Sequence, residues 1–108
     1  MVKKKSKILW DIEAKKLLLS IYNYIKYRES QGQAQRAKKR ILKEVRNLIL
    51  FPEKFSVEPH LQSEKGNYRF RAIWSYKIIY EITPEAILVL DIFHTSRNPQ
   101  SITKLSED

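Results

Sequence analysis

Three β-rich runs in the last third of the chain, joined by very short connections, constrain the fold most strongly. They cover residues 67–73, 76–82 and 86–93, and only residues 74–75 and 83–85 separate them. A parallel crossover needs a dozen or more residues, so connections this short require antiparallel pairing. The sequence therefore predicts a mostly antiparallel sheet in this part of the chain.

Two amphipathic patterns precede these runs and predict a pair of helices. Apolar side chains recur at three- and four-residue spacing over residues 14–25 and again over residues 34–49, which is the stripe of an amphipathic helix. Residues 31–32, Gln-Gly, interrupt the pattern, and the Phe-Pro pair at residues 51–52 is expected to end the second helix. Helices joined by so short a break pack most simply as an antiparallel hairpin that buries both stripes against the sheet.

The residues before the first helix complete the predicted architecture. The apolar run at residues 8–10 suggests a first strand, and Asp11 is a candidate helix N-cap. A chain of 108 residues is expected to form one domain over residues 1–108, with its core at about residues 8–99. The predicted fold class is α+β, with an N-terminal strand and an αα hairpin packed on a mostly antiparallel β-sheet.

The charge balance indicates the kind of partner. The net charge is +9, from 21 Lys and Arg against 12 Asp and Glu, and such a field favours phosphate-rich or acidic partners. A basic surface that is merely solvated is the alternative. Charged residues at positions 11–16 break the apolar stretch that a signal peptide needs, and no run approaches the roughly 20 apolar residues of a membrane span. We therefore expect a cytoplasmic protein with no membrane partner.

Cations in and after the predicted strands are the candidate reaction centre. Arg69 and Arg71 are two apart on a strand and should project from the same face. Arginines beneath the helices would need partners, which favours an exposed, anion-binding face. His94, at the predicted end of the last strand, offers an imidazole that could move a proton, and Arg97, just past the strand, offers a guanidinium that can grip phosphate. Strand-end packing and a surface salt bridge are the alternative roles for these two residues.

Further cations are candidates for binding a nucleic acid or a protein target. Lys77 either adds to the basic face from the next strand or pairs with Asp91 across the sheet. The second helix carries a basic row whose members either attract a nucleic acid or an acidic partner or form a solvated face. This row includes Arg36, Lys39, Arg40 and Lys43.

Several other chemistries have no support in the sequence. The chain has no cysteine, which removes disulfide scaffolds, thiolate zinc sites and cysteine nucleophiles. Its two histidines, His60 and His94, are too isolated to predict a zinc site. Single glycines provide no nucleotide-binding loop, and the glutamates form no evident metal cluster. We therefore expect neither a metal nor a small-molecule cofactor.

The order of the predicted elements, together with local residues, resembles the RelE/ParE family of toxins from type II toxin–antitoxin systems. The resemblance covers about residues 8–99. The residues that carry it are Ala14 with Leu17 or Leu18 and then Ile21-Tyr22-Asn23-Tyr24-Ile25, Leu48 followed by Phe51-Pro52, Tyr68-Arg69, Tyr76-Lys77-Ile78-Ile79-Tyr80-Glu81-Ile82 and Phe93-His94-Thr95-Ser96-Arg97.

The resemblance implies a toxin that arrests growth when free and is silenced by an antitoxin encoded beside it, which we expect to be acidic. Members similar to RelE cleave ribosome-bound messenger RNA without a metal, and here Arg69, Arg71, His94 and Arg97 would stabilise the phosphorane and move protons. Members similar to ParE instead poison DNA gyrase. Members similar to RelE generally carry a catalytic tyrosine near the end of the chain. No tyrosine follows Phe93 here, so the residues after Phe93 resemble ParE more closely. The target stays open between the ribosome and gyrase, and a non-toxic nucleic-acid-binding domain is the alternative.

Overall fold

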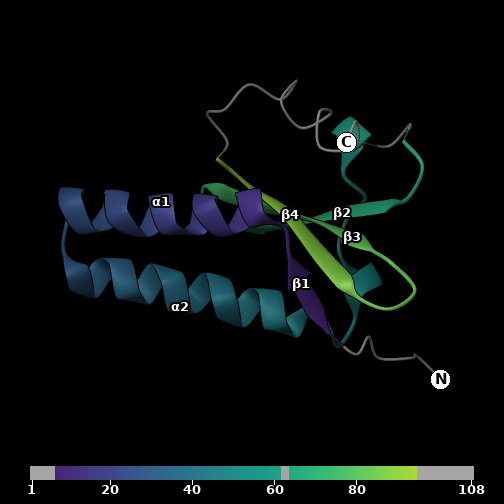
Figure 1. Ribbon diagram of the computed structural model, residues 1–108, viewed down its shortest axis with the longest axis horizontal. Coiled ribbons are helices and arrows are strands. Elements are labelled where there is room, and N and C mark those ends of the chain that lie inside the picture. The colour runs from purple at the N-terminus through teal and green to yellow at the C-terminus, as the bar shows by residue number, and fades with distance from the viewer. Residues whose placement is uncertain (1–6, 62–63, 95–108) are drawn as a thin grey trace.

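The computed structural model describes residues 7–61 and 64–94, and these form two helices and one four-stranded sheet (Figure 1). In chain order the elements are β1 (Ile8–Trp10), α1 (Ile12–Arg28), α2 (Gln31–Asn47), two short 3₁₀ helices η1 (Pro52–Lys54) and η2 (Pro59–Leu61), β2 (Asn67–Ile73), β3 (Tyr76–Ile82) and β4 (Ile87–His94). The predicted α+β fold class is confirmed. None of the helices within the described residues is both long and apolar enough for a bilayer crossing.

Side-chain caps fix where the two helices begin. Asp11 caps α1 as predicted, since its carboxylate accepts a hydrogen bond of 3.0 Å from the backbone N–H of Glu13. The break between the helices lies at residues 29–30, and the prediction of a break at residues 31–32 is wrong. Ser30 is the N-cap of α2 because its hydroxyl accepts from the N–H of Gln33 at 3.1 Å. This cap brings residues 31–32 into the first turn of α2.

The second helix ends earlier than its apolar pattern suggests. Its last residue is Asn47, followed by a turn over residues 48–50, so the helix ends before the Phe51-Pro52 pair that is expected to stop it, and the apolar pattern to Ile49 runs past its end. Leu48 is nevertheless fully buried and packs with Tyr80 and Ile87. The apolar spacing therefore correctly identifies a core residue, although that residue lies just beyond the helix.

The sheet has the order β1-β4-β3-β2. As predicted, β2 pairs antiparallel with β3, and β3 pairs antiparallel with β4, whereas β1 lies parallel to β4. The last strand begins at Ile87, one residue later than predicted. An irregularity between Ile79 and Tyr80 shifts the register of β3 against β4, which increases the local twist.

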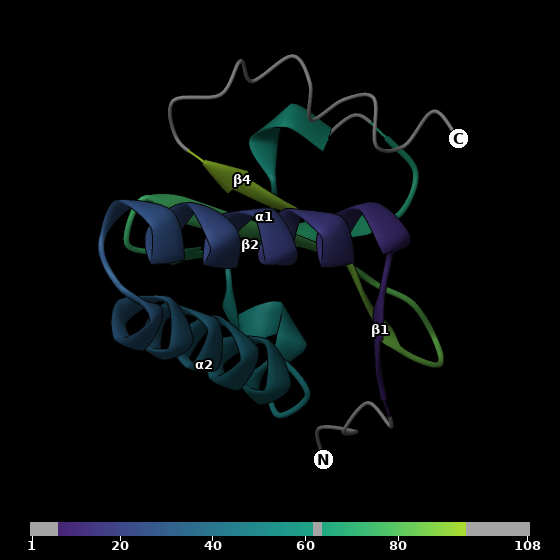
Figure 2. The same cartoon turned by 60° about the vertical axis from the view of Figure 1, so that its left-hand side comes forward.

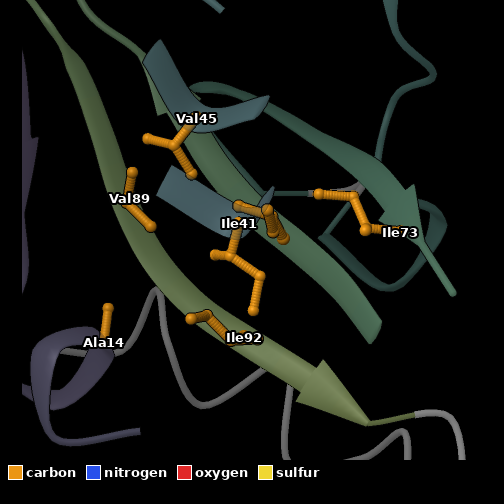
Figure 3. Close-up of a cluster of buried hydrophobic side chains, with 7 residues drawn as sticks. Ala14, Ile41, Val45, Ile73, Val89 and Ile92 are labelled. Atoms are coloured by element: carbon orange, nitrogen blue, oxygen red, sulfur yellow. The ribbon is translucent and has the colours of Figure 1, made fainter. Parts of the chain in front are cut away.

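The helical hairpin covers one face of the sheet (Figures 1 and 2). Ile41 and Val45 of α2 meet Val89 and Ile92 of β4 in a buried cluster, shown in Figure 3. Truncating a fully buried residue such as Ile41 to alanine typically costs about 2–5 kcal/mol. The distal half of the hairpin projects beyond the sheet (Figure 1), and this overhang leaves part of α1 available for other contacts.

The segment between α2 and β2 passes around β2, and its η2 part packs on the opposite face of the sheet. Leu61 of η2 packs there with Tyr68 and Ile79 in a second buried cluster. The N–H of Glu58 donates to the carbonyl of Tyr68 at 2.9 Å, which holds the segment along the edge of β2. These contacts place the Glu58 side chain in the interior.

Candidate functional site

Arg69 lies on the face of β2 that points toward the helices, and its guanidinium is bonded within the protein. It sits opposite Tyr80 in the β2–β3 register. Its Nη1 donates to the carbonyl oxygens of Phe55 at 2.7 Å and Glu53 at 3.2 Å, and its Nε donates to Asn67 Oδ1 at 3.0 Å. Arg69 therefore ties the connection after α2 to the sheet.

Arg71 projects from the same face as Arg69, as the two-residue spacing predicts, and it too is engaged internally. Its Nη2 lies 3.0 Å from Glu44 Oε2 of α2, and its guanidinium stacks 4.9 Å from the centre of the Phe55 ring. The prediction that Arg69 and Arg71 form an exposed, anion-binding face is wrong. Arg69 has partners because the segment after α2 folds back over this part of the sheet. Arg71 is paired with Glu44 of α2 itself, and only its ring contact with Phe55 comes from that segment.

Lys77 lies on the other face of the sheet and binds a buried glutamate. It is opposite Ala72 in the register, so it projects away from the face that carries Arg71. Its Nζ is 3.0 Å from Glu58 Oε2 and 4.2 Å from the centre of the Phe70 ring. The prediction that Lys77 enlarges the basic face of Arg69 and Arg71 is therefore wrong.

Glu58 is a buried charge that the sequence analysis missed. Its side chain is completely buried, and Oε1 lies 2.8 Å from His60 Nδ1 and 3.1 Å from the His60 backbone nitrogen. Burial alone raises the pKa of Glu58, but the bonds from His60 and Lys77 outweigh burial and leave the pKa below its ordinary value. No sequence pattern marks this site, because its three members come together only through the path of the η2 segment.

His94 lies at the end of β4 as predicted, on the rim of an apolar groove. Its ring meets Tyr76 edge-on, with centroids 5.1 Å apart and planes at 79°. The groove has a volume of about 450 Å³ and opens between α1 and the ends of β3 and β4. It is lined by Leu17, Ser20, Ile21, Tyr24, Tyr76, Ile92 and His94. Burial, and secondarily the neighbouring Tyr24, raise the pKa of Tyr76.

The predicted basic row lies on the exposed side of α2. Arg36, Lys39, Arg40 and Lys43 are all exposed. Arg40 lies over the ring of Trp74, at 5.5 Å from its centre, and Trp74 itself is 62% exposed in the turn between β2 and β3. Trp74 was not singled out from the sequence, although an aromatic residue in a two-residue hairpin turn is an identifiable signal.

Of the four residues predicted to act together in catalysis, the structure describes Arg69, Arg71 and His94, and it does not bring these three together. Arg69 and Arg71 are bonded internally on β2, and His94 is on β4, with β3 between them. Arg97 lies outside the described residues. Within residues 7–61 and 64–94 no three His, Cys, Asp or Glu side chains gather as metal ligands would. The described arrangement offers an apolar groove and a basic helix face.

Comparisons with known proteins agree with the architecture. The family model for the ParE toxin of type II toxin–antitoxin systems, parDE, matches residues 8–99. Among solved structures, the fold is similar to a chain of a chromosomal ParDE toxin–antitoxin system from P. aeruginosa, with a TM-score of 0.70 and 20% sequence identity. The match covers 84% of this chain and 96% of that chain. No curated protein matches the sequence significantly.

Proposed function

The chain belongs to the ParE toxin family of type II toxin–antitoxin systems, and from this premise we propose that it arrests growth by binding DNA gyrase rather than by cleaving messenger RNA. The family resemblance seen in the sequence is confirmed, and with it the protein's place as the toxin component of such a system. Gyrase as the target is an inference from the ParE side of that resemblance and from the contacts of two arginines.

The internal bonding of Arg69 and Arg71 is the observation that supports this choice. Metal-independent RNA cleavage needs cationic donors aimed at the phosphate as its charge develops. The guanidinium of Arg69 is already committed to two backbone carbonyls, and that of Arg71 to Glu44. Turning Arg71 toward a substrate would leave Glu44 without this partner and would break a stabilising contact between α2 and β2. Binding to gyrase through the protein surface does not require Arg69 or Arg71 to leave these partners.

The test compares the two targets directly with the purified full-length chain. We expect inhibition of plasmid supercoiling by purified bacterial gyrase, and an intact message when the same preparation is added to a cell-free translation reaction. His94→Ala and Arg97→Ala are expected to leave the message intact as well. Message cuts at in-frame codon positions, together with normal supercoiling, would show that the protein is a ribosome-dependent nuclease.

We further propose that the cognate antitoxin silences the toxin by seating an apolar segment in the groove lined by Leu17, Ile21 and Tyr24. The groove walls are mainly apolar side chains of α1, β3 and β4, and an amphipathic helix typically enters such a groove through its apolar face. The chain carries a net charge of +9, so acidic residues beside that segment would be attracted to the basic face of α2.

A further inference from the structure

Trp74 is held in a conformation that its side chain does not favour. Its φ is 53°, in the left-handed region, and it occupies the first position of the two-residue turn between β2 and β3. Glycine or asparagine normally takes this position, and a bulky residue there costs about 1–3 kcal/mol. The turn nevertheless presents a large aromatic ring that is 62% exposed. A strained and exposed aromatic residue is more consistent with a binding role than with a role in stability.

Neighbouring residues of α2 orient this ring. The guanidinium of Arg40 lies 5.5 Å from the centre of the Trp74 ring, and its Nε is 3.3 Å from Glu44 Oε1. The second oxygen of Glu44 binds Arg71 on β2 at 3.0 Å. Arg40 is thus anchored through Glu44 to the sheet, so the indole and the guanidinium are held together in a defined geometry.

The charge around this pair is almost entirely positive. Glu44 is the one acidic residue in α2, and it is already bound to Arg40 and Arg71. Arg36, Arg40 and Lys43 stand at spacings of four and three residues, which places them along one stripe of the helix. Successive members of this stripe are about 4.5–6 Å apart along the axis. A flexible polyanion can follow such a row while one of its groups rests on Trp74.

We propose that Trp74 and the stripe of Arg36, Arg40 and Lys43 form a binding surface for single-stranded nucleic acid. One base stacks on the indole, and the adjacent phosphates contact the stripe. An acidic peptide would satisfy the cations, but its Asp and Glu side chains carry no aromatic ring to stack on the exposed indole. Duplex DNA keeps its bases in the stack, so the ring would remain unused. This surface goes beyond the proposed action on gyrase.

The proposal is tested by fluorescence anisotropy with a labelled oligothymidine of about 15 nucleotides, a length suited to a single-strand site. Trp74→Gly removes the ring and suits the positive φ of the turn. We expect it to weaken binding by about tenfold, the effect that loss of one stacked base typically has, with no loss of thermal stability. Trp74→Tyr keeps a stacking ring and should bind nearly as well as the wild type.

The salt dependence separates stacking from charge. Arg36→Ala and Lys43→Ala should each weaken binding and reduce the slope of log affinity against log salt by about 0.7, measured between about 50 and 200 mM. Trp74→Gly should leave this slope unchanged. Lys16→Ala removes the same charge from α1, where Lys16 pairs with Glu13, and is the matched control that should change binding little.

Three outcomes would overturn the proposal. The first is equal binding by the wild type and Trp74→Gly, and the second is preference for a duplex of the same length. The third is displacement of the labelled oligonucleotide by polyglutamate as readily as by unlabelled oligothymidine of equal charge, which would identify the surface as a docking site for an acidic protein. Because the assay contains neither gyrase nor ribosomes, its result is independent of the proposed target of the toxin.

Discussion

At the scale of single residues, the contacts of the charged side chains explain why the candidate site was only partly predictable. The alternation of a strand correctly places Arg69 and Arg71 on one face. Their partners include the carbonyls of Glu53 and Phe55, which belong to an irregular segment. Since such a segment has no periodicity, the sequence does not indicate which face of the sheet it covers. The same segment delivers Glu58 to Lys77, which is why this buried pair was also missed.

Glu58 gives the protein a defined sensitivity to acid. Its pKa is lowered in the folded state from an unfolded value near 4.5. Its ionisation therefore stabilises the fold fully above that value, and this contribution is lost as the pH falls through the lower folded pKa. We expect urea denaturation to show wild-type stability falling with pH in this window, with a shallower fall for Glu58→Gln. At neutral pH the variant should be less stable by about 1–3 kcal/mol. Glu13→Gln, at an exposed ion pair, should keep the wild-type pH dependence.

Tyr80 joins the middle of the sheet to the segment after α2. Its hydroxyl donates to the carbonyl oxygen of Pro52 at 2.6 Å, and burial raises its pKa to about 12. Tyr80→Phe removes this donor and leaves the Pro52 carbonyl unsatisfied, so we expect a loss of about 1–3 kcal/mol in the free energy of unfolding. Chemical denaturation measures the loss. A variant as stable as the wild type would mean that water reaches this carbonyl.

At the scale of elements, the apolar patterns and capping residues predicted the type of each helix and strand better than its boundaries. The strands at residues 67–73 and 76–82 match β2 and β3 because short turns and β-rich composition define both ends. The predicted break between the helices lies two residues too late, because Gly32 has a low helix propensity whereas Ser30 carries no such signal. The Ser30 hydroxyl decides the boundary through its bond to Gln33, and a glycine in a first turn costs little there.

The two glycines of the chain provide a matched test at this scale. Gly66 leads into β2 with a φ of 113°, and an added Cβ would lie 2.9 Å from Tyr68 Cε2 and 3.0 Å from Glu81 Oε2. We expect Gly66→Ala to destabilise the fold by about 2–3 kcal/mol. At Gly32 the nearest atom to an added Cβ is Ser30 Oγ at 3.8 Å, so Gly32→Ala should stabilise α2 by up to about 1 kcal/mol. Thermal unfolding of Gly66→Ala and Gly32→Ala measures both changes in stability. The same change in both variants would mean that the positive φ and the close contacts of Gly66 do not matter for stability.

At the scale of the whole molecule, the overhang of the helical hairpin and the net charge of +9 act on association rather than on folding. The C-terminal half of α1 contributes Ile21 and Tyr24 to the groove, where they lie beside Tyr76 of β3. Long-range attraction to an acidic partner speeds its capture and weakens with salt. Apolar contact in the groove then determines how slowly the partner leaves.

The proposed seat of the antitoxin can be tested without disturbing the fold, because two exposed tyrosines lie one turn apart on α1. Tyr24 lines the groove and is 59% exposed, whereas Tyr27 is 89% exposed and is not among the lining residues. Tyr24→Glu removes apolar contact and sets a negative charge against an acidic partner, so we expect at least a tenfold loss of affinity, about 1.4 kcal/mol. Tyr27→Glu makes the same charge change and should cost little. Calorimetric titration with the product of the adjacent gene measures both. Equal losses would assign the antitoxin to the basic helix face rather than to the groove, because only a long-range charge effect treats the two positions alike.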